Sequence, residues 1–306
     1  RPMNERSKES VIRIDGHDIE IGHPDKLLFR SPDITKLALA EYYQKISDVA
    51  LRHYRDRALS MHRYPDGIDD EGFFQKNIGD HFPDWIERKT LSKQDGKVTY
   101  VVANNAATLV YLADQACITP HLALSRIDRP DHPDRMIFDL DPSDDDFDKI
   151  RKTARHLEKF LNELKLTSFV QTSGSRGLHV VVPLDRSEDF DRVREFSHRV
   201  CRKLAKKYPE LMTVEQRKNK RGKRVFLDDL RNAYGQTSVA PYAVRARPGA
   251  PVATPLHWDE VANADLHPQR YTISNLFRRL GQIDDPWADI DQHAQGLNNA
   301  CDYLIG

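Results

Sequence analysis

The chain has 306 residues, of which 39% are hydrophobic and 31% are charged, the balance of a folded globular protein and not of a disordered one. Its formal net charge is zero, from 47 basic and 47 acidic residues, which argues against a protein that coats nucleic acid non-specifically. No apolar run approaches the ~18 residues that a membrane-spanning helix needs, and three widely spaced cysteines favour a reducing cytoplasm over a disulfide framework or a zinc site.

The first part of the chain is predicted to combine helices with short strands. Residues 1–12 start with a polar run that lacks the apolar core of a secretory signal, and we expect a flexible tail there. After Pro32 and Asp33, apolar side chains recur near the helical period as far as Tyr54 and predict a helix. Two strands and a second helix are predicted next, at Leu59–Arg63, Val98–Val102 and Ala106–Ala116.

From Met136 the chain alternates between apolar strand-like runs and amphipathic helical stretches. The order β-α-β-β-α-β is typical of a split βαβ sheet with its helices packed on one face. The predicted elements are, in order, Met136–Asp141, Phe147–Leu164, Ser168–Gln171, Leu178–Val182, Phe190–Leu204 and Arg224–Leu227. The final segment holds a short amphipathic helix, Ile273–Leu280, and we expect it to wrap the core.

Two aspartates, Asp139 and Asp141, lie inside the first apolar strand of this region. Because successive side chains of a strand alternate between faces, the two carboxylates share one face, about 7 Å apart at their Cα atoms. Hard divalent ions, about 3.5–4 Å apart in two-metal sites, would neutralise such a pair. Asp228 at the end of the last strand is the preferred third ligand, since Asp229 would face the other side. The alternative, an acidic strand end that caps a helix, suits Asp144–Asp146 but does not explain aspartates within an apolar strand.

Charge is segregated along the chain. Residues 215–224 carry six basic side chains and one acid, whereas residues 139–148 carry six acids and no base. A basic loop and an acidic cluster in one chain favour a polyanion held beside a metal site. Two solvated loops are the alternative that charge alone leaves open.

The segment Thr172–His179, with the sequence TSGSRGLH, joins two predicted strands. Its glycines allow positive φ, so successive backbone N–H groups can form an anion-binding nest, to which Ser173 and Arg176 add a hydroxyl and a charge. His179 is the one polar side chain of the strand that follows. The segment is a candidate triphosphate cradle, although it lacks the P-loop pattern and a glycine–serine hairpin is often an ordinary turn.

The ordered motifs FDLDP at 138–142, TSGSRGLH at 172–179 and VFLD at 225–228 resemble those of the archaeo-eukaryotic primase superfamily, and more closely those of the polymerase domain of bacterial ligase D. The resemblance covers most of the chain. It implies a primase-type polymerase fold of the α/β (α+β) class in one domain, residues 13–306. Within it, an N-terminal α/β module that contacts DNA ends, an RRM-like split βαβ catalytic module and a C-terminal wrap are expected at residues 13–130, 131–260 and 261–306.

The resemblance also assigns roles to particular side chains. Asp139, Asp141 and Asp228 are the expected catalytic residues and the expected ligands of two Mn²⁺ or Mg²⁺ ions. The residues expected to contact a ribo- or deoxynucleoside triphosphate are Ser173, Arg176, His179, Arg245, Arg247, Phe73, Phe74, Arg63 and His62. The residues expected on DNA are Lys26 and Lys36 at a 5′-phosphate, and Lys220 and Arg221 in a primer-binding loop. Secondary candidates are His121 and Asn232.

Some positions depart from the family pattern. His62 stands where relatives usually have lysine, so this nucleotide contact is expected to be weaker or pH-dependent. Ala123 stands near His121 where an aromatic residue is common, which weakens the case for His121. The chain lacks the zinc-binding cysteines of the cellular primase subunit, and this favours a repair polymerase.

The predicted function is therefore template-directed nucleotide addition that fills gaps and extends DNA ends in double-strand break repair, with ribonucleotides favoured. The alternatives are a metal-dependent nuclease or phosphodiesterase and a non-catalytic module that binds DNA ends. The expected partners are gapped or broken DNA with a 5′-phosphate, nucleoside triphosphates, Ku and a ligase domain, and the expected location is the bacterial or archaeal cytoplasm at the nucleoid. No membrane is expected.

Overall fold

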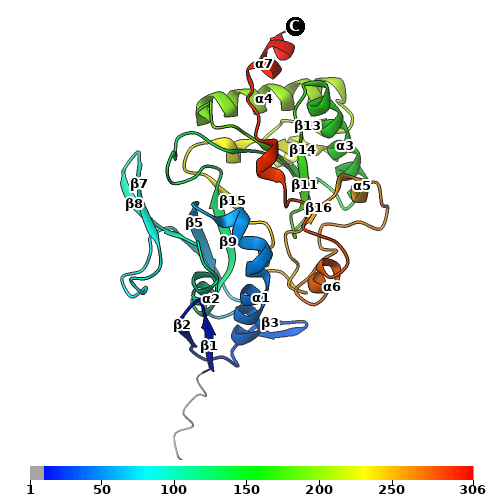
Figure 1. Cartoon of the computed structure of the whole chain (residues 1–306). Coiled ribbons are helices and arrows are strands. Elements are labelled where there is room, and N and C mark those ends of the chain that lie inside the picture. Colours follow the sequence, from blue (N-terminus) through cyan, green and yellow to red (C-terminus); the bar gives the residue numbers. More distant parts are fainter. Residues whose placement is uncertain (1–9, 306) are drawn as a thin grey trace, which may run out of the picture.

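Two β-sheets, each with its own helices, organise residues 10–305, the part of the chain that this computed structural model describes (Figure 1). The first sheet has the strand order β15-β9-β5-β8-β7, with β6 paired to β5, and the second has the order β13-β14-β10-β12-β11-β16. Helices and sheets are mixed along the chain, which confirms the predicted α/β class.

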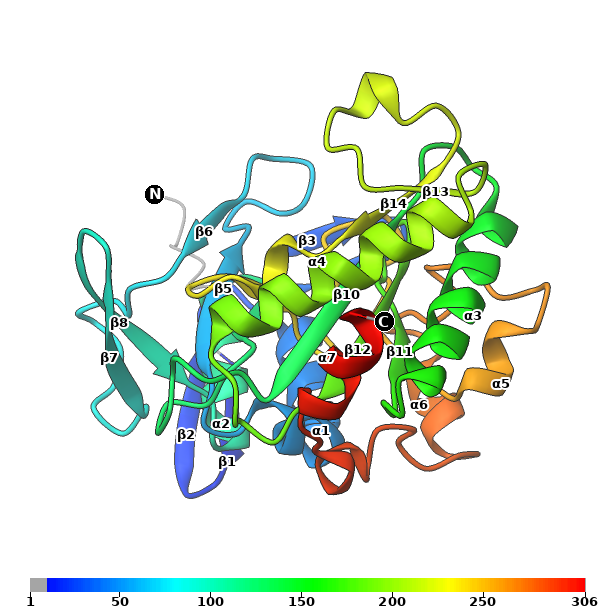
Figure 2. The same cartoon turned by 90° about the horizontal axis from the view of Figure 1, so that it is seen from above.

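The N-terminal module is built around α1 (Lys36–Tyr54), which begins where the Thr35 hydroxyl accepts a hydrogen bond from the Ala38 N–H. Helix α2 (Ala106–Asp114) packs on α1 and shares one apolar core with the sheet. The sheet strands are β5 (Ala58–Arg63), β6 (Phe73–Gln75), β7 (Arg88–Lys93), β8 (Gly96–Val102), β9 (Cys117–Ala123) and β15 (Thr237–Val239). Two small hairpins consist of β1 (Ser10–Ile14) with β2 (His17–Ile21), and of β3 (Leu27–Arg30) with β4 (Asp33–Thr35). The β7-β8 hairpin projects from the module (Figures 1 and 2).

The second sheet has β10 (Arg135–Asp141) at its centre, antiparallel to β12 on one side and to β14 on the other. The strand order β14-β10-β12-β11 is the split βαβ arrangement that the sequence predicts. The remaining elements of this module are α3 (Phe147–Glu163), β11 (Phe169–Thr172), β12 (Leu178–Pro183), α4 (Phe190–Lys207), β13 (Met212–Thr213), η1 (Lys218–Lys220), β14 (Val225–Asp228), η2 (Leu230–Asn232) and β16 (Pro255–Leu256).

The two faces of the second sheet have different surroundings. Phe138 and Leu140 are buried in a core that includes apolar residues of α3 and α4, which cover the outer face of the sheet (Figure 1). Asp139 and Asp141 therefore lie on the opposite face, the one toward the N-terminal module. The alternation of apolar and acidic residues at the end of β10 thus separates a packed side from an acidic side.

Three parts of the architecture differ from the prediction. Ser10–Ile14 forms β1, so the predicted tail over residues 1–12 ends sooner; its first nine residues lie outside the described part of the chain. Strand β15 pairs with β9, and residues 239–253 contribute to the N-terminal core, although the sequence assigned them to the catalytic module. In the first sheet, β6, β7, β9 and β15 were not predicted as strands. β7 is a largely exposed polar strand, and β9, which contains Pro120, is buried along most of its length, so neither shows an alternating pattern.

The final segment contacts both modules. It contains α5 (Trp258–Val261), α6 (Leu276–Leu280), η3 (Ile290–His293) and α7 (Asn298–Ile305). Phe277 of α6 lies against Tyr42 of α1, with ring centroids 5.6 Å apart, whereas Leu297 and Leu304 join the core of the second sheet. Across residues 10–305, every helix is too short or too polar to span a bilayer.

Candidate active site

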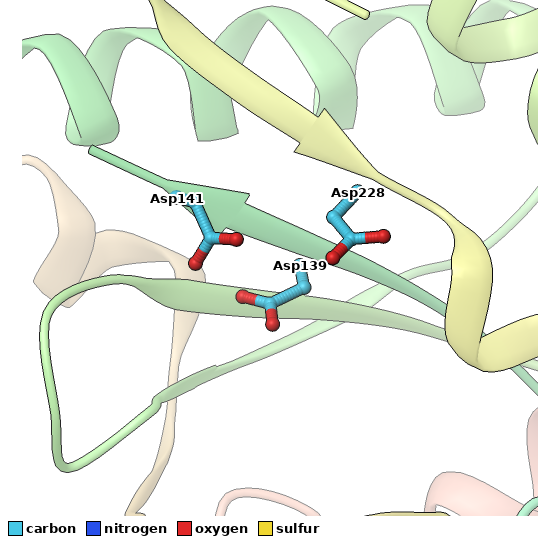
Figure 3. A group of neighbouring side chains, drawn as sticks. All are labelled: Asp139, Asp141 and Asp228. Carbon is cyan, nitrogen blue, oxygen red and sulfur yellow. The ribbon is translucent and has the colours of Figure 1, made fainter. Parts of the chain in front are cut away.

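Three carboxylates converge where β10 and β14 run side by side. Asp139 and Asp228 are direct cross-strand partners, and Asp141 lies two residues further along β10 on the same face. One oxygen from each of the three carboxylates lies within 4.8 Å of the others. Figure 3 shows the three side chains pointing into a shared space from these two strands. The structure thus brings together the three residues that the sequence singled out, and it favours Asp228 over Asp229.

The charges in this cluster are incompletely compensated by protein groups. Burial, together with the charges of Asp139 and Asp228, raises the pKa of Asp141 to about 7. Burial also raises the pKa of Asp228. At Asp139 burial acts in the same direction, but His179 outweighs it and the pKa falls below the ordinary value. A set of carboxylate oxygens that resists full ionisation fits hard divalent ions, which would supply the missing positive charge.

The binding of divalent ions to this cluster should depend steeply on pH. With its pKa at about 7, Asp141 is mainly protonated at pH 6 and ionised at pH 8, and a metal ion must displace that proton. We expect Mn²⁺ to bind about tenfold more tightly at pH 8 than at pH 6, with close to one proton released at the lower pH. Calorimetry in buffers of different ionisation enthalpy measures both quantities.

The control for this pH dependence is Asp141→Asn, an amide of the same shape that cannot titrate. The variant should bind Mn²⁺ weakly, with most of the pH dependence lost. Equal affinity of the unmodified protein at the two pH values would contradict the role of Asp141. A pH dependence that persists in the variant would instead assign the proton to another group.

The loop between β11 and β12 faces the carboxylates. The Ser173 hydroxyl accepts hydrogen bonds from the N–H groups of Ser175 and Gly177, both at 3.0 Å, and closes the loop into a compact turn. A side chain at Gly177 would place its Cβ 2.0 Å from the Leu140 carbonyl oxygen, so only glycine lets the loop approach β10 this closely. Arg245 donates to the Ser173 carbonyl oxygen from the other side. The loop is therefore held rigidly next to the acidic strand.

A polar pocket of about 380 Å³ joins these parts. The predicted site residues that line it are His121, Asp139, Asp141, Ser173, Arg176, His179, Arg221, Arg245 and Arg247. Burial lowers the pKa of His121, with further lowering by Arg245, and burial lowers the pKa of Arg245 to about 10. The pocket thus combines carboxylates with several arginines, an arrangement suited to a polyanion that is bridged by cations.

Sequence reasoning missed three further polar residues that line the pocket, Lys218, Arg231 and Ser238. Arg231 helps to lower the pKa of Asp139 and so acts on the carboxylate cluster directly. Arg231 lies three residues after Asp228, and this closeness in sequence could have indicated that it belongs to the site. Ser238 lies on β15, which joins the other sheet, so only the fold brings it here.

The predicted aromatic pair lies on β6, at the edge of this region. Phe73 and Phe74 are both exposed, with 46% and 56% of their surface accessible. The His62 ring stacks on Phe74 with ring centroids 4.0 Å apart, and the His121 ring meets the same phenyl ring edge-on at 5.2 Å. Arg63 donates to the Gln115 carbonyl oxygen and lies over the Phe73 ring. Two exposed rings next to a polyanion pocket are suited to stacking on bases.

Several other predicted residues lie outside the pocket or are occupied by contacts within the protein. Lys26 pairs with Asp66 at 3.1 Å, and Lys36 is largely buried in a pair with Asp114, also at 3.1 Å. The Lys26 carbonyl accepts a hydrogen bond from the Lys36 N–H, so the two lysines are neighbours. A phosphate bound to these two lysines would have to displace Asp66 and Asp114 or bind the lysines together with them.

The basic loop and Asn232 are held by backbone contacts. Arg221 donates to the carbonyl oxygens of Glu215 and Gln216 and lies over the Phe226 ring, 3.7 Å from guanidinium carbon to ring centroid. Lys220 is exposed in η1. Asn232 is fully buried, and its amide bonds the N–H and carbonyl of Ile137. Its observed contacts therefore tie η2 to β10 and lie away from the pocket.

The chain resembles known proteins in both sequence and fold. A family model described as "LigD, primase-polymerase domain" matches residues 35–287. The chain is 31% identical over 279 residues to the multifunctional non-homologous end joining protein LigD of Mycolicibacterium smegmatis, covering 90% of this chain and 36% of that protein. It is 33% identical over 296 residues to the protein of the same name from Pseudomonas aeruginosa, covering 94% and 34%.

A solved structure, the polymerase domain from Mycobacterium tuberculosis ligase D in complex with DNA, superimposes with a TM-score of 0.85 at 29% identity. The match covers 90% of this chain and 99% of that chain. The chain therefore spans about a third of the length of these two curated relatives, yet nearly all of the solved polymerase domain.

Proposed function

This chain belongs to the LigD primase-polymerase domain family, and we propose that it is a template-directed nucleotidyltransferase that fills gaps and extends DNA ends in non-homologous end joining. The observation that carries the proposal is the convergence of three carboxylates within 4.8 Å, opposite a rigid glycine–serine loop and several arginines. That arrangement matches the needs of phosphoryl transfer, in which catalysis consists of positioning and charge stabilisation.

Asp139, Asp141 and Asp228 would hold two divalent ions, for which Mn²⁺ and Mg²⁺ are the candidates. When bound, such ions lower the pKa of an attacking hydroxyl and neutralise phosphate charge. The protein's own groups supply the rest. The N–H groups of the loop Thr172–Gly177 that are not used in its own turn, those of Gly174 and Arg176, would bind phosphate oxygens together with the serine hydroxyls, and Arg245 would bind the same phosphates. His179, next to Asp139, would contact the same triphosphate.

The exposed rings of Phe73 and Phe74 would stack on the incoming base and the template, at about 1–3 kcal/mol per base and with little dependence on which base is present. Lys26 and Lys36 would hold the 5′-phosphate across a gap, a contact that positions DNA without reading its sequence. The preference for ribonucleotides, Ku and a ligase domain as partners, and a cytoplasmic place at the nucleoid are further parts of the proposal that the family membership supports.

Primer extension on gapped DNA with a 5′-phosphate tests the proposal most directly. We expect Mn²⁺-dependent addition of the templated nucleotide, with ribonucleotides added faster than deoxynucleotides. A nuclease would shorten the primer and would need no nucleotide, whereas a non-catalytic end binder would retard the DNA without changing its length. Either of those outcomes, with no extension by any nucleotide, would reject the polymerase assignment.

A further inference from the structure

A row of four polar side chains crosses the catalytic sheet and includes two members of the carboxylate cluster. Asp228 is paired with Asp139, Asp139 with His179, and His179 with Gln171, across β14, β10, β12 and β11. Cross-strand partners place their side chains on the same face, so the four form one continuous line. The first three have roles in the proposed chemistry, and Gln171 is the last member.

Gln171 is buried, with 1% of its surface accessible, and it is absent from the lining of the active-site pocket. Its side-chain nitrogen lies 3.3 Å from Nδ1 of His179. The opposite ring nitrogen, Nε2 of His179, lies 3.2 Å from Oδ1 of Asp139. The imidazole is thus held between an amide at the back and a carboxylate at the front.

These two contacts select the same form of the neutral ring. A neutral imidazole has one N–H donor and one acceptor nitrogen, and an ionised carboxylate can only accept. Asp139 therefore requires the proton on Nε2, which leaves a lone pair on Nδ1. An amide N–H of Gln171 donates to that lone pair, whereas its carbonyl oxygen would repel it. A hydrocarbon side chain would leave Nδ1 without a partner in a buried position.

The amide oxygen of Gln171 can bond water in a neighbouring cavity. Within residues 10–305, no protein group bonds Oε1 of Gln171 or Nδ1 of His53, and both residues line one cavity of about 40 Å³ between the two modules. A water molecule needs about 10–15 Å³ and polar partners. The cavity has room for water that bonds the amide oxygen, which leaves the amide N–H for His179.

We propose that Gln171 is a positioning residue, which donates a hydrogen bond to Nδ1 of His179 and thereby holds the ring with its Nε2–H directed at Asp139 and the nucleotide site. The inference rests on the proposed function only in the role given to His179. Partners of this kind orient a functional histidine without touching the substrate, and their loss typically lowers ligand affinity or activity about 10–100-fold.

The ring proton can be located without any catalytic assay. In the metal-free protein with ¹⁵N-labelled histidine, at about pH 8, above the ordinary range of histidine titration, we expect ring shifts of the Nε2–H form, assigned by their absence in His179→Gln. In Gln171→Met, which keeps length and flexibility but removes the donor, we expect the two ring nitrogens to move toward averaged values. An Nδ1–H form in the unmodified protein, or an unchanged spectrum in the variant, would overturn the inference.

Kinetic measurements provide a second test of the proposal. Gln171→Met should lower kcat/KM for the nucleotide about tenfold. In the His179→Gln background the same change should have almost no further effect, because the residue acts through that ring. An equal loss in both backgrounds would show that Gln171 acts elsewhere. If no extension occurs with any form of the protein, the proposed function fails, and the ring spectra still decide the position of the proton.

Gln295 offers a matched control. Its side-chain nitrogen donates to the carbonyl oxygens of Thr167 and Pro183, so it loses comparable hydrogen bonds when replaced, but it has no contact with the polar row. Gln295→Met should lower the thermal midpoint and leave both the His179 ring shifts and the nucleotide KM unchanged. If the His179 ring shifts change in this control as they do in Gln171→Met, the cause is a general loosening of the sheet, and the inference is rejected.

Discussion

Asp139→Ala should reduce nucleotide incorporation at least about a thousandfold, which corresponds to about 4 kcal/mol of lost transition-state stabilisation. Asp139 is the central carboxylate, paired with Asp228 across the strands and contacted by His179. Its removal opens the cluster at the point where the other two carboxylates converge. Single-turnover extension of a gapped primer, at saturating Mn²⁺ and nucleotide, measures the loss in the chemical step apart from binding.

DNA binding should survive in the same variant. Lys26, Lys36 and the exposed rings, which are proposed to contact DNA, belong to the N-terminal module and are untouched by this change, so the affinity for 5′-phosphorylated gapped DNA should change by less than about threefold. Asp145→Ala is the matched control, because this exposed residue belongs to the same acidic run but not to the cluster. Extension retained by Asp139→Ala, or lost in both variants, would contradict the two-metal assignment.

Much of the catalytic sheet could be predicted because the patterns that determine it lie within short segments of the sequence. Strand β10 alternates acidic and apolar side chains, and this period alone places Asp139 and Asp141 on one face. The two amphipathic helices then require an apolar sheet face to cover, which leaves few ways to arrange the strands. The proximity of Asp228 followed from that order, and the structure agrees.

What could not be predicted depends on contacts between distant segments. Ser238 reaches the pocket because β15 leaves the catalytic module and pairs with β9. No local sequence pattern predicts this pairing. The role proposed for Gln171 was missed for a related reason. Within β11 it is one polar residue near a strand end, and only the register across β12 sets it behind His179. Sequence periodicity gives the face of a strand but not its neighbour.

A buried charge network joins the two modules. Arg57, which follows α1, donates both ends of its guanidinium to Asp134 just before β10, at 2.6 and 2.7 Å. Arg126 donates to the same carboxylate at 3.0 Å. Arg57 and Asp134 are 2% and 5% accessible, so this pair is shielded from solvent. It fixes the start of β10, and hence the carboxylates at its other end, against the N-terminal module.

Asp134→Ala should therefore destabilise the protein by about 3–5 kcal/mol, because a buried guanidinium that loses its carboxylate partner keeps its desolvation penalty. The arginine left behind, Arg57, still donates to the backbone carbonyl oxygens of His53 and Ala123, but these neutral groups do not compensate its charge. Urea denaturation at pH 7, followed by fluorescence and by far-UV circular dichroism together, gives the free energy of unfolding.

The dependence of this effect on pH has a definite sign. Burial alone would raise the pKa of Asp134, but the surrounding guanidinium groups outweigh it and hold that pKa well below the ordinary value. A carboxyl whose pKa is lowered on folding stabilises the fold above its unfolded pKa and loses that contribution as the pH falls. The stability difference between the unmodified protein and Asp134→Asn should thus be largest near neutral pH and shrink below about pH 4.

A salt bridge on the protein surface serves as the control for this buried network. Asp128 also accepts two hydrogen bonds from one arginine, Arg186, at 2.8 and 3.1 Å, but it is exposed to solvent. Asp128→Ala should cost less than about 1 kcal/mol, because water replaces the lost partner and screens the remaining charge. If Asp134→Ala costs no more than this control, burial does not strengthen the junction, and the position of β10 must be set by apolar packing alone.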